Sequence, residues 1–187
     1  DGYPLVKMAV IHHQFESSHA FYDGNGRTCR IINILYLVKE GLLKLPILYL
    51  SRYINQNKGD YYRLLQKVRT ENAWEEWVLY MLEGVEQTSL QTIEIIDGIK
   101  NLMLKHKRKI RENTKLYSQD LINNLFKHPY TKIDFVMSDL DVTRLTATKY
   151  LDELDQIGIV HKVKLGRDNY YINTDLYELL SNVNQAK

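Results

Sequence analysis

The sequence has only one cysteine, Cys29, among its 187 residues. A single thiol cannot form an internal disulfide, and the chain lacks the cysteine clusters that structural zinc sites use. Proteins of this composition are typical of a reducing compartment, so we expect a cytoplasmic protein that folds without covalent cross-links.

Long apolar runs and a dominant charge are also missing. The stretch 31–38 is interrupted by Asn33 and ends at Lys39, well short of the roughly 20 apolar residues that span a bilayer. Twenty-five basic residues against 23 acidic ones leave a net charge of +2, which is too weak to indicate a nucleic acid or a membrane as a general partner. The chain begins with neither an initiator Met nor a signal pattern, so we expect it to be an N-terminally truncated part of a longer product.

Hydrophobic residues make up 44% of the chain, which suits a packed core. Their three- and four-residue spacing predicts an amphipathic helix from Pro4 to Ser18. A second helix, from about Arg27 to Glu40, has apolar residues around most of its circumference and is expected to be buried. Further helices are predicted around Tyr61 and Tyr62 and, almost without interruption, from Ala73 to about Arg111.

The second half of the chain has a different pattern. A basic run predicts a linker over residues 105–115 between two domains, residues 1–104 and 116–187. Three short helical patterns then precede two strand-like runs, which are separated by a Gly-Arg-Asp-Asn sequence that favours a hairpin turn. Thr143 is a good cap for the third helix, as in a helix-turn-helix. Three helices followed by a hairpin predict a winged helix-turn-helix domain.

The segment from His19 to Arg30, HAFYDGNGRTCR, joins the first two predicted helices. Its Gly-Asn-Gly sequence opens a helix, where free backbone N–H groups and the positive end of the helix dipole together favour a phosphate. Arg27 and Arg30 are three residues apart and can turn toward the same anion. Asp23 could hold Mg²⁺ against phosphate oxygens, and His19 could take a proton from an incoming hydroxyl.

The segment resembles the signature of the Fic (filamentation induced by cAMP) family, His-x-Phe-x-[Asp/Glu]-Gly-Asn-Gly-Arg-x-x-Arg. Every specified position matches: His19, Phe21, Asp23, Gly24, Asn25, Gly26, Arg27 and Arg30. The resemblance implies a mainly α fold, in which a Fic-type helical bundle is followed by a small winged helix-turn-helix domain of α+β type. It also implies a protein adenylyltransferase that moves AMP from ATP, with Mg²⁺, to a Ser, Thr or Tyr hydroxyl of a target protein or of itself.

The resemblance also implies roles for individual residues. His19 would be the catalytic base, Asp23 the Mg²⁺ ligand, and Phe21 an anchor that holds the loop in the core. The nucleotide phosphates would be bound by Gly24, Asn25, Gly26, Arg27 and Arg30. Tyr61 and Tyr62 fall in the region that lies beside the nucleobase in relatives.

Several alternatives stay open from the sequence. Gly26 argues against the kinase-like branch of the family, which has Lys at this position, but other members transfer UMP or phosphocholine, or remove AMP. A DNA-binding regulator with a sensory or inactive Fic domain would instead use Arg144, Lys149 and Arg167. The predicted recognition helix also carries acidic residues, which is unfavourable for DNA, so protein docking is the favoured role of this domain. No membrane partner is expected.

Overall fold

The computed structural model of the protein describes residues 3–182. The chain forms two compact units, residues 1–93 and 94–187. Helices dominate both units, and the second also contains a three-stranded antiparallel sheet. The predicted fold class, a helical bundle followed by a small α+β region, is confirmed. Within the described residues, no helix has the length and apolar character needed to cross a membrane.

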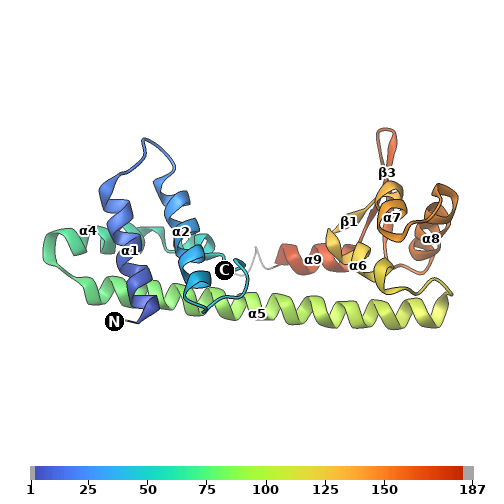
Figure 1. Cartoon of the computed structure of the whole chain (residues 1–187). Helices are drawn as coiled ribbons and strands as arrows, with labels where there is room; N and C mark the ends of the chain where they lie inside the picture. The colour runs from blue at the N-terminus through green and yellow to red at the C-terminus, as the bar shows by residue number, and fades with distance from the viewer. Residues whose placement is uncertain (1–2, 183–187) are drawn as a thin grey trace. The chain divides into compact units, whose positions relative to one another are not determined.

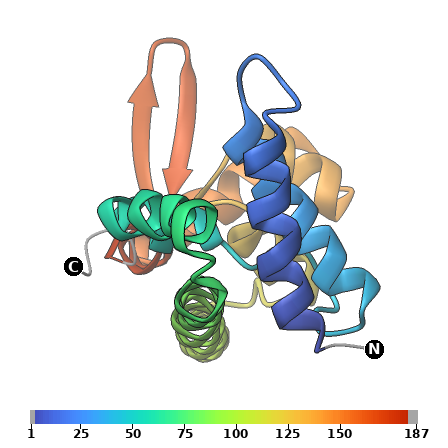
Figure 2. The same cartoon turned by 90° about the vertical axis from the view of Figure 1, so that its left-hand side faces the viewer.

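The first unit is built around two neighbouring helices. Its elements are α1 (Pro4–Ser18), α2 (Asn25–Lys39), α3 (Leu50–Gln56), α4 (Lys58–Glu71) and the first part of α5 (Trp74–Asn113). Helices α1 and α2 lie side by side in opposite directions, and the loop between them forms one end of the pair (Figures 1 and 2). This loop contains most of the predicted site.

The core of the first unit explains how α1 is held. Pro4 occupies the first turn of α1, where a helix does not need the N–H that proline lacks. Met8 and Ala9 are fully buried on the inner side of this helix, and Trp77 of α5 donates its indole N–H to the carbonyl of Ala9 at 2.8 Å. The loop at the end of α1 therefore begins from a fixed position.

Helix α2 is buried on one side only, so our expectation that it is surrounded by protein is wrong. Cys29, Asn33 and Leu37, which are four residues apart, form its buried stripe. Ile31 and Leu35 are each 57% exposed because α2 packs mainly against α1 and these two residues fall outside that contact.

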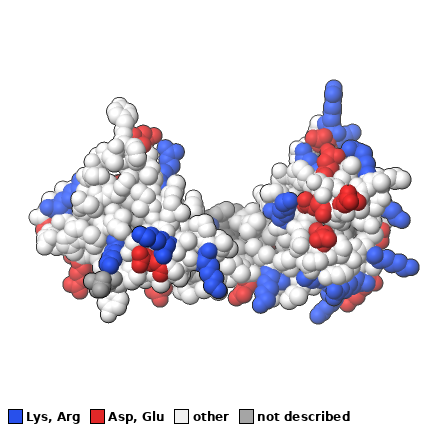
Figure 3. Space-filling view, in the orientation of Figure 1, with Lys and Arg blue, Asp and Glu red and all other residues white. Residues whose placement is uncertain are grey.

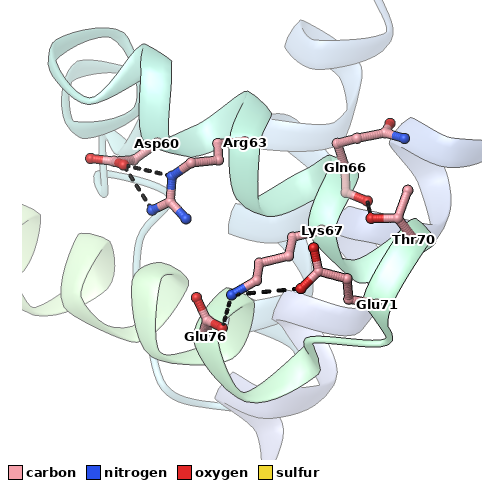
Figure 4. Close-up of polar contacts among 7 residues, drawn as sticks. All are labelled: Asp60, Arg63, Gln66, Lys67, Thr70, Glu71 and Glu76. Atoms are coloured by element: carbon pink, nitrogen blue, oxygen red, sulfur yellow. Dashed lines mark hydrogen bonds and ion pairs between the residues drawn. The ribbon is translucent and has the colours of Figure 1, made fainter.

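Helix α4 also separates a buried from a charged side. Tyr61, Leu64 and Val68 point into the core. The outer side carries ion pairs, in which Lys67 contacts both Glu71 and Glu76, the latter on α5 (Figure 4). A neighbouring pair joins Asp60 to Arg63 at 2.9 Å.

The second unit contains the end of α5 and seven further elements. These are α6 (Gln119–Lys127), β1 (Tyr130–Thr131), α7 (Ile133–Leu140), α8 (Arg144–Gln156), β2 (His161–Leu165), β3 (Asp168–Ile172) and α9 (Thr174–Asn182). The strand order is β1-β3-β2, and β2 and β3 form the predicted hairpin. Ser118 and Thr143 cap α6 and α8 through their hydroxyl groups.

The segment predicted as a linker, residues 105–115, is mostly helical, in agreement with the helix that the sequence predicts as far as about Arg111. Residues 105–113 are the last turns of α5. His106 and Ile110, one helical turn apart, are both buried, and Ile110 belongs to the core of the second unit together with Leu121 and Leu151. The basic side chains that suggested a connector lie on the other sides of the same helix.

Candidate active site

The loop between α1 and α2 begins and ends with residues in the left-handed conformation. His19 ends α1 at φ 44°, and Gly24 precedes α2 at φ 85°. Only glycine adopts such angles without a steric cost, which explains the glycine at position 24. The side chain of His19 is exposed, so its imidazole can reach a hydroxyl group from solvent.

Asn25 fastens the loop with its side chain. Its Oδ1 accepts a hydrogen bond from the Phe21 N–H at 2.9 Å, and its Nδ2 donates one to the Phe21 carbonyl at 2.6 Å. The side-chain amide is therefore used inside the loop. The backbone N–H groups at the start of α2 have no carbonyl partner within the helix, so they keep the anion-binding capacity that the sequence predicts.

Phe21 does not anchor the loop in the core, contrary to our expectation. Its ring is 52% exposed, and it contacts the ring of Phe15 with the two centroids 6.1 Å apart. The loop extends beyond the end of α1, where the core does not reach. The hydrogen bonds from Asn25 hold the backbone of Phe21 instead.

Asp23 and Arg27 form an ion pair on the surface of the loop. The Oδ1 of Asp23 accepts the N–H of Gly24 at 2.6 Å, and its Oδ2 lies 3.3 Å from Arg27 Nη2. The two side chains are 87% and 74% exposed, and pairs of this kind contribute only about 0–1 kcal/mol. Arg27 can therefore exchange Asp23 for a phosphate at little cost. A single exposed carboxylate also suits Mg²⁺, which takes its other ligands from water and phosphate oxygens.

Arg30 is half-buried and packs against Gly26. A Cβ atom at Gly26 would lie 3.1 Å from Arg30 Nη1 and 3.4 Å from Glu16 Oε1. The absence of a side chain at Gly26 therefore leaves room for these two charged groups beside the first turn of α2.

A polar network beneath the loop supports α1. His12 is fully buried, and its two ring nitrogens bond the Tyr61 hydroxyl at 2.9 Å and the Asn33 amide at 2.6 Å. Burial, followed by the charges of Arg30 and His13, lowers the pKa of His12 to about 3. The imidazole is therefore neutral, and it links α1 with α2 and α4.

This network is not a convincing metal site. Among the described residues, the potential ligand atoms of His12, Glu16 and Cys29 lie within 4.8 Å of one another. However, both ring nitrogens of His12 are already hydrogen-bonded, and burial raises the pKa of Cys29 to about 12, which keeps the thiol protonated. The cluster has the properties of a polar core.

The two tyrosines predicted beside the nucleobase lie in different environments. Tyr61 is 4% exposed and its hydroxyl bonds His12, so it is a core residue and not an accessible ring. Tyr62 is 57% exposed, because the next position on α4 points about 100° away from Tyr61. Of this pair, only Tyr62 could contact a base.

Glu16 is a residue of the site that the sequence did not reveal to us. It lies on α1, three residues before His19, and its Oε1 is close to Gly26. Burial raises the pKa of Glu16, while the charges of Arg30, His19 and Arg69 act in the opposite direction. His19 caps the end of α1 in the left-handed conformation, three residues after Glu16, and this spacing alone did not mark Glu16 as part of the site.

The residues proposed for DNA contact lie in the second unit. Arg144 forms an ion pair with Asp134 at 2.9 Å, and Lys149 and Arg167 are exposed on α8 and at the hairpin turn. Leu145, in the first turn of α8, is 83% exposed. In the view of Figure 3, acidic and basic side chains are interspersed over this unit, so no strongly basic face is visible there. DNA binding stays an untested prediction.

Comparisons with known protein families match two separate segments of the chain. Residues 1–37 match the Fic/DOC family, and residues 102–176 match the C-terminal domain described as protein adenylyltransferase SoFic-like. Among solved structures, a Fic family protein from Desulfovibrio desulfuricans G20 is similar at 21% identity with a TM-score of 0.48. The alignment covers 92% of this chain and 50% of that protein, so this chain spans about half the length of that relative.

Proposed function

We propose that this chain, which matches the Fic/DOC family over residues 1–37 and a SoFic-like C-terminal domain over residues 102–176, acts as a protein adenylyltransferase. The proposed reaction transfers AMP from ATP to a Ser, Thr or Tyr hydroxyl of a target protein or of the enzyme itself. The observation that carries this proposal is the loop itself. The loop runs from His19, at the end of α1, through Asp23 to Arg27 and Arg30 in the first turns of α2, and Gly24 and Gly26 add no side chain at the start of that helix.

In the proposed reaction, the start of α2 binds the nucleotide phosphates and the end of α1 provides the catalytic base, His19. The N–H groups at the start of α2 bind the phosphates, helped by the positive end of the helix dipole. Arg27 leaves Asp23 and binds the terminal phosphates together with Arg30, whose guanidinium already lies beside Gly26 at the first turn of α2. The α-phosphorus then lies near the exposed imidazole of His19.

The transfer is a displacement at the α-phosphorus. The target hydroxyl oxygen forms the new P–O bond while His19 accepts its proton, and the bond from the α-phosphorus to the bridging oxygen of the β-phosphate breaks. The products are an AMP ester on the target and pyrophosphate. Mg²⁺, held by Asp23 and phosphate oxygens, would supply positive charge that offsets the charge of the triphosphate.

His19→Ala tests this proposal most directly. The protein is incubated with ATP and Mg²⁺, with and without a cell extract, and proteins are weighed by intact mass spectrometry. We expect a gain of one AMP in the presence of wild-type protein and a loss of at least about 100-fold in rate for His19→Ala, which is the usual contribution of a catalytic base. His161→Ala removes an exposed histidine from the second unit and should transfer AMP like the wild type.

The same measurement separates the alternatives. A gain of phosphate alone would indicate kinase-like chemistry, and a gain of UMP or phosphocholine from the corresponding donors would change the transferred group. Loss of AMP from a modified protein would indicate the reverse reaction. Full activity of His19→Ala would contradict the role of His19. The target protein, the cytoplasmic location and the docking role of the second unit are parts of this proposal that need their own tests.

A further inference from the structure

Glu16 places an unpaired negative group next to the phosphate-binding loop. Glu16 is half-buried. Its Oε1 is shielded from solvent and has no hydrogen-bond partner in the described part of the chain. The same atom would be 3.4 Å from a Cβ atom at Gly26. Glu16 is thus directed from the end of α1 toward the first turn of α2.

Arg30 approaches the same point from α2. Its Nη1 would be 3.1 Å from a Cβ atom at Gly26, and its Nε is shielded from solvent without a hydrogen-bond partner among the described residues. Arg27, by contrast, is 74% exposed and pairs with Asp23 at the surface. The two arginines of the loop are therefore held in different ways.

A shielded carboxylate oxygen or guanidinium N–H without a hydrogen-bond partner destabilises the folded chain, most of all when the group is charged. Two opposite charges directed at one point reduce this cost for each other, because their attraction is stronger in a half-buried site than in water. The charge of Arg30 is also the largest contribution that favours the ionised form of Glu16. The carboxylate therefore has a physical reason to keep Arg30 folded against Gly26.

We infer that Glu16 is a positioning residue, which holds the guanidinium of Arg30 over Gly26 so that it faces the anion-binding turn of α2. The inference rests on the proposed function for the identity of the anion, the terminal phosphates of a nucleotide. Glu16 acts through Arg30 and does not itself contact the substrate. Without the carboxylate, the Arg30 side chain is free to leave Gly26 and extend into solvent, as Arg27 does.

The order of the Arg30 side chain can be measured directly, without a substrate. Arginine Nε–Hε signals are recorded by ¹⁵N NMR on the full chain, and Arg30 is assigned by the signal that disappears in Arg30→Lys. We expect an ordered Nε–Hε group in the wild type, with an order parameter close to that of the rigid backbone, about 0.85, and one below about 0.6 in Glu16→Gln.

Two further variants make the result specific. Glu40→Gln removes an exposed carboxylate at the other end of α2 and should leave the Arg30 signal unchanged. Glu16→Asp keeps the charge on a shorter side chain and should keep Arg30 more ordered than Glu16→Gln does. An Arg30 signal that is equally ordered in the wild type and in Glu16→Gln would overturn the inference, as would an Arg30 signal that is disordered in the wild type.

Activity then separates this inference from the proposed function. If Arg30 loses order in Glu16→Gln and AMP transfer slows by about ten-fold, as expected for a coupled pair of neighbours, both stand. If Arg30 loses order but the wild type transfers no AMP, the proposed reaction fails while the role of Glu16 stands. If the wild type transfers AMP and Glu16→Gln matches it in rate and in Arg30 order, only the role of Glu16 fails.

Discussion

Replacing Gly24 with alanine should damage the nucleotide site through backbone strain alone. Gly24 has φ 85°, and an added Cβ atom would approach nothing closer than the Arg27 guanidinium at 3.8 Å. The methyl group therefore fits, but an L-residue in the left-handed region costs about 1–2 kcal/mol. The simplest relief is to unwind the first turn of α2, which removes the N–H groups proposed to bind phosphate.

The size of the effect follows from that cost. If the strain is relieved by opening the turn, the population of the closed turn relative to the open one falls by about 5- to 30-fold. Once the open form becomes dominant, nucleotide affinity falls by a corresponding factor. Gly24→Asn should lose less, because asparagine tolerates the left-handed region better than alanine does.

Gly41 provides a matched control. It has φ 73°, and no atom lies within 4 Å of its added Cβ, but it follows the opposite end of α2. Gly41→Ala should lower the melting temperature about as much as Gly24→Ala while leaving ATP·Mg²⁺ affinity, measured by calorimetry, unchanged. Wild-type affinity in Gly24→Ala, or an equal loss in Gly41→Ala, would refute the reasoning.

Two further predictions concern the core of the first unit. Gly84→Ala would place a Cβ atom 2.7 Å from the Tyr53 ring and should destabilise the fold by about 1–3 kcal/mol, whereas Gly59→Ala meets nothing within 4 Å on α4 and should be neutral or stabilising by up to about 1 kcal/mol. Denaturant unfolding of both variants checks this, and equal midpoints would contradict it. Because the pKa of His12 is lowered from 6.5 to about 3, its contribution to stability should be complete above about pH 6.5 and lost as the pH falls toward 3. His12→Gln should unfold with a weaker pH dependence in that window, and an unchanged dependence would exclude His12 as its source.

The sequence predicted the parts of the structure that depend on local patterns. The bounds of α1 agree with the predicted range, because Pro4 and a regular apolar spacing mark this helix without help from distant residues. The loop residues were proposed as the site because they stand at closely spaced positions of one short segment, and their roles stay a prediction. The hairpin β2–β3 was predicted for the same reason, since its turn residues lie between two strand-like runs.

The errors arose where distant contacts decide the outcome. Tyr61 and Tyr62 are adjacent in sequence, and only packing against His12 determines which of them is buried. Phe21 was expected in the core because the family resemblance implies an anchor at this position, but the loop extends beyond the core and the ring is exposed. Strand β1 has only two residues and exists through its pairing with β3, so it leaves no periodic signal.

Glu16 illustrates a different limit. An isolated glutamate on an amphipathic helix is normally a solvated residue, and nothing in its immediate neighbourhood in sequence marks it as special. Glu16 comes near Arg30 only because the loop reverses the direction of the chain and because Gly26 has no side chain to separate them. Such a relation is visible only when both helix ends are placed in space.

The two hydrogen bonds between Asn25 and Phe21 have a consequence for the thermodynamics of binding. Fixing the backbone of a flexible residue costs about 1–2 kcal/mol of conformational free energy. If several loop residues became ordered only on binding, this cost would greatly weaken the binding of a nucleotide. Here the two hydrogen bonds between Asn25 and Phe21 fix the conformation of the loop when the chain folds, before any nucleotide binds. Association should therefore resemble docking to a rigid receptor, with a small entropic penalty and a rate limited mainly by encounter.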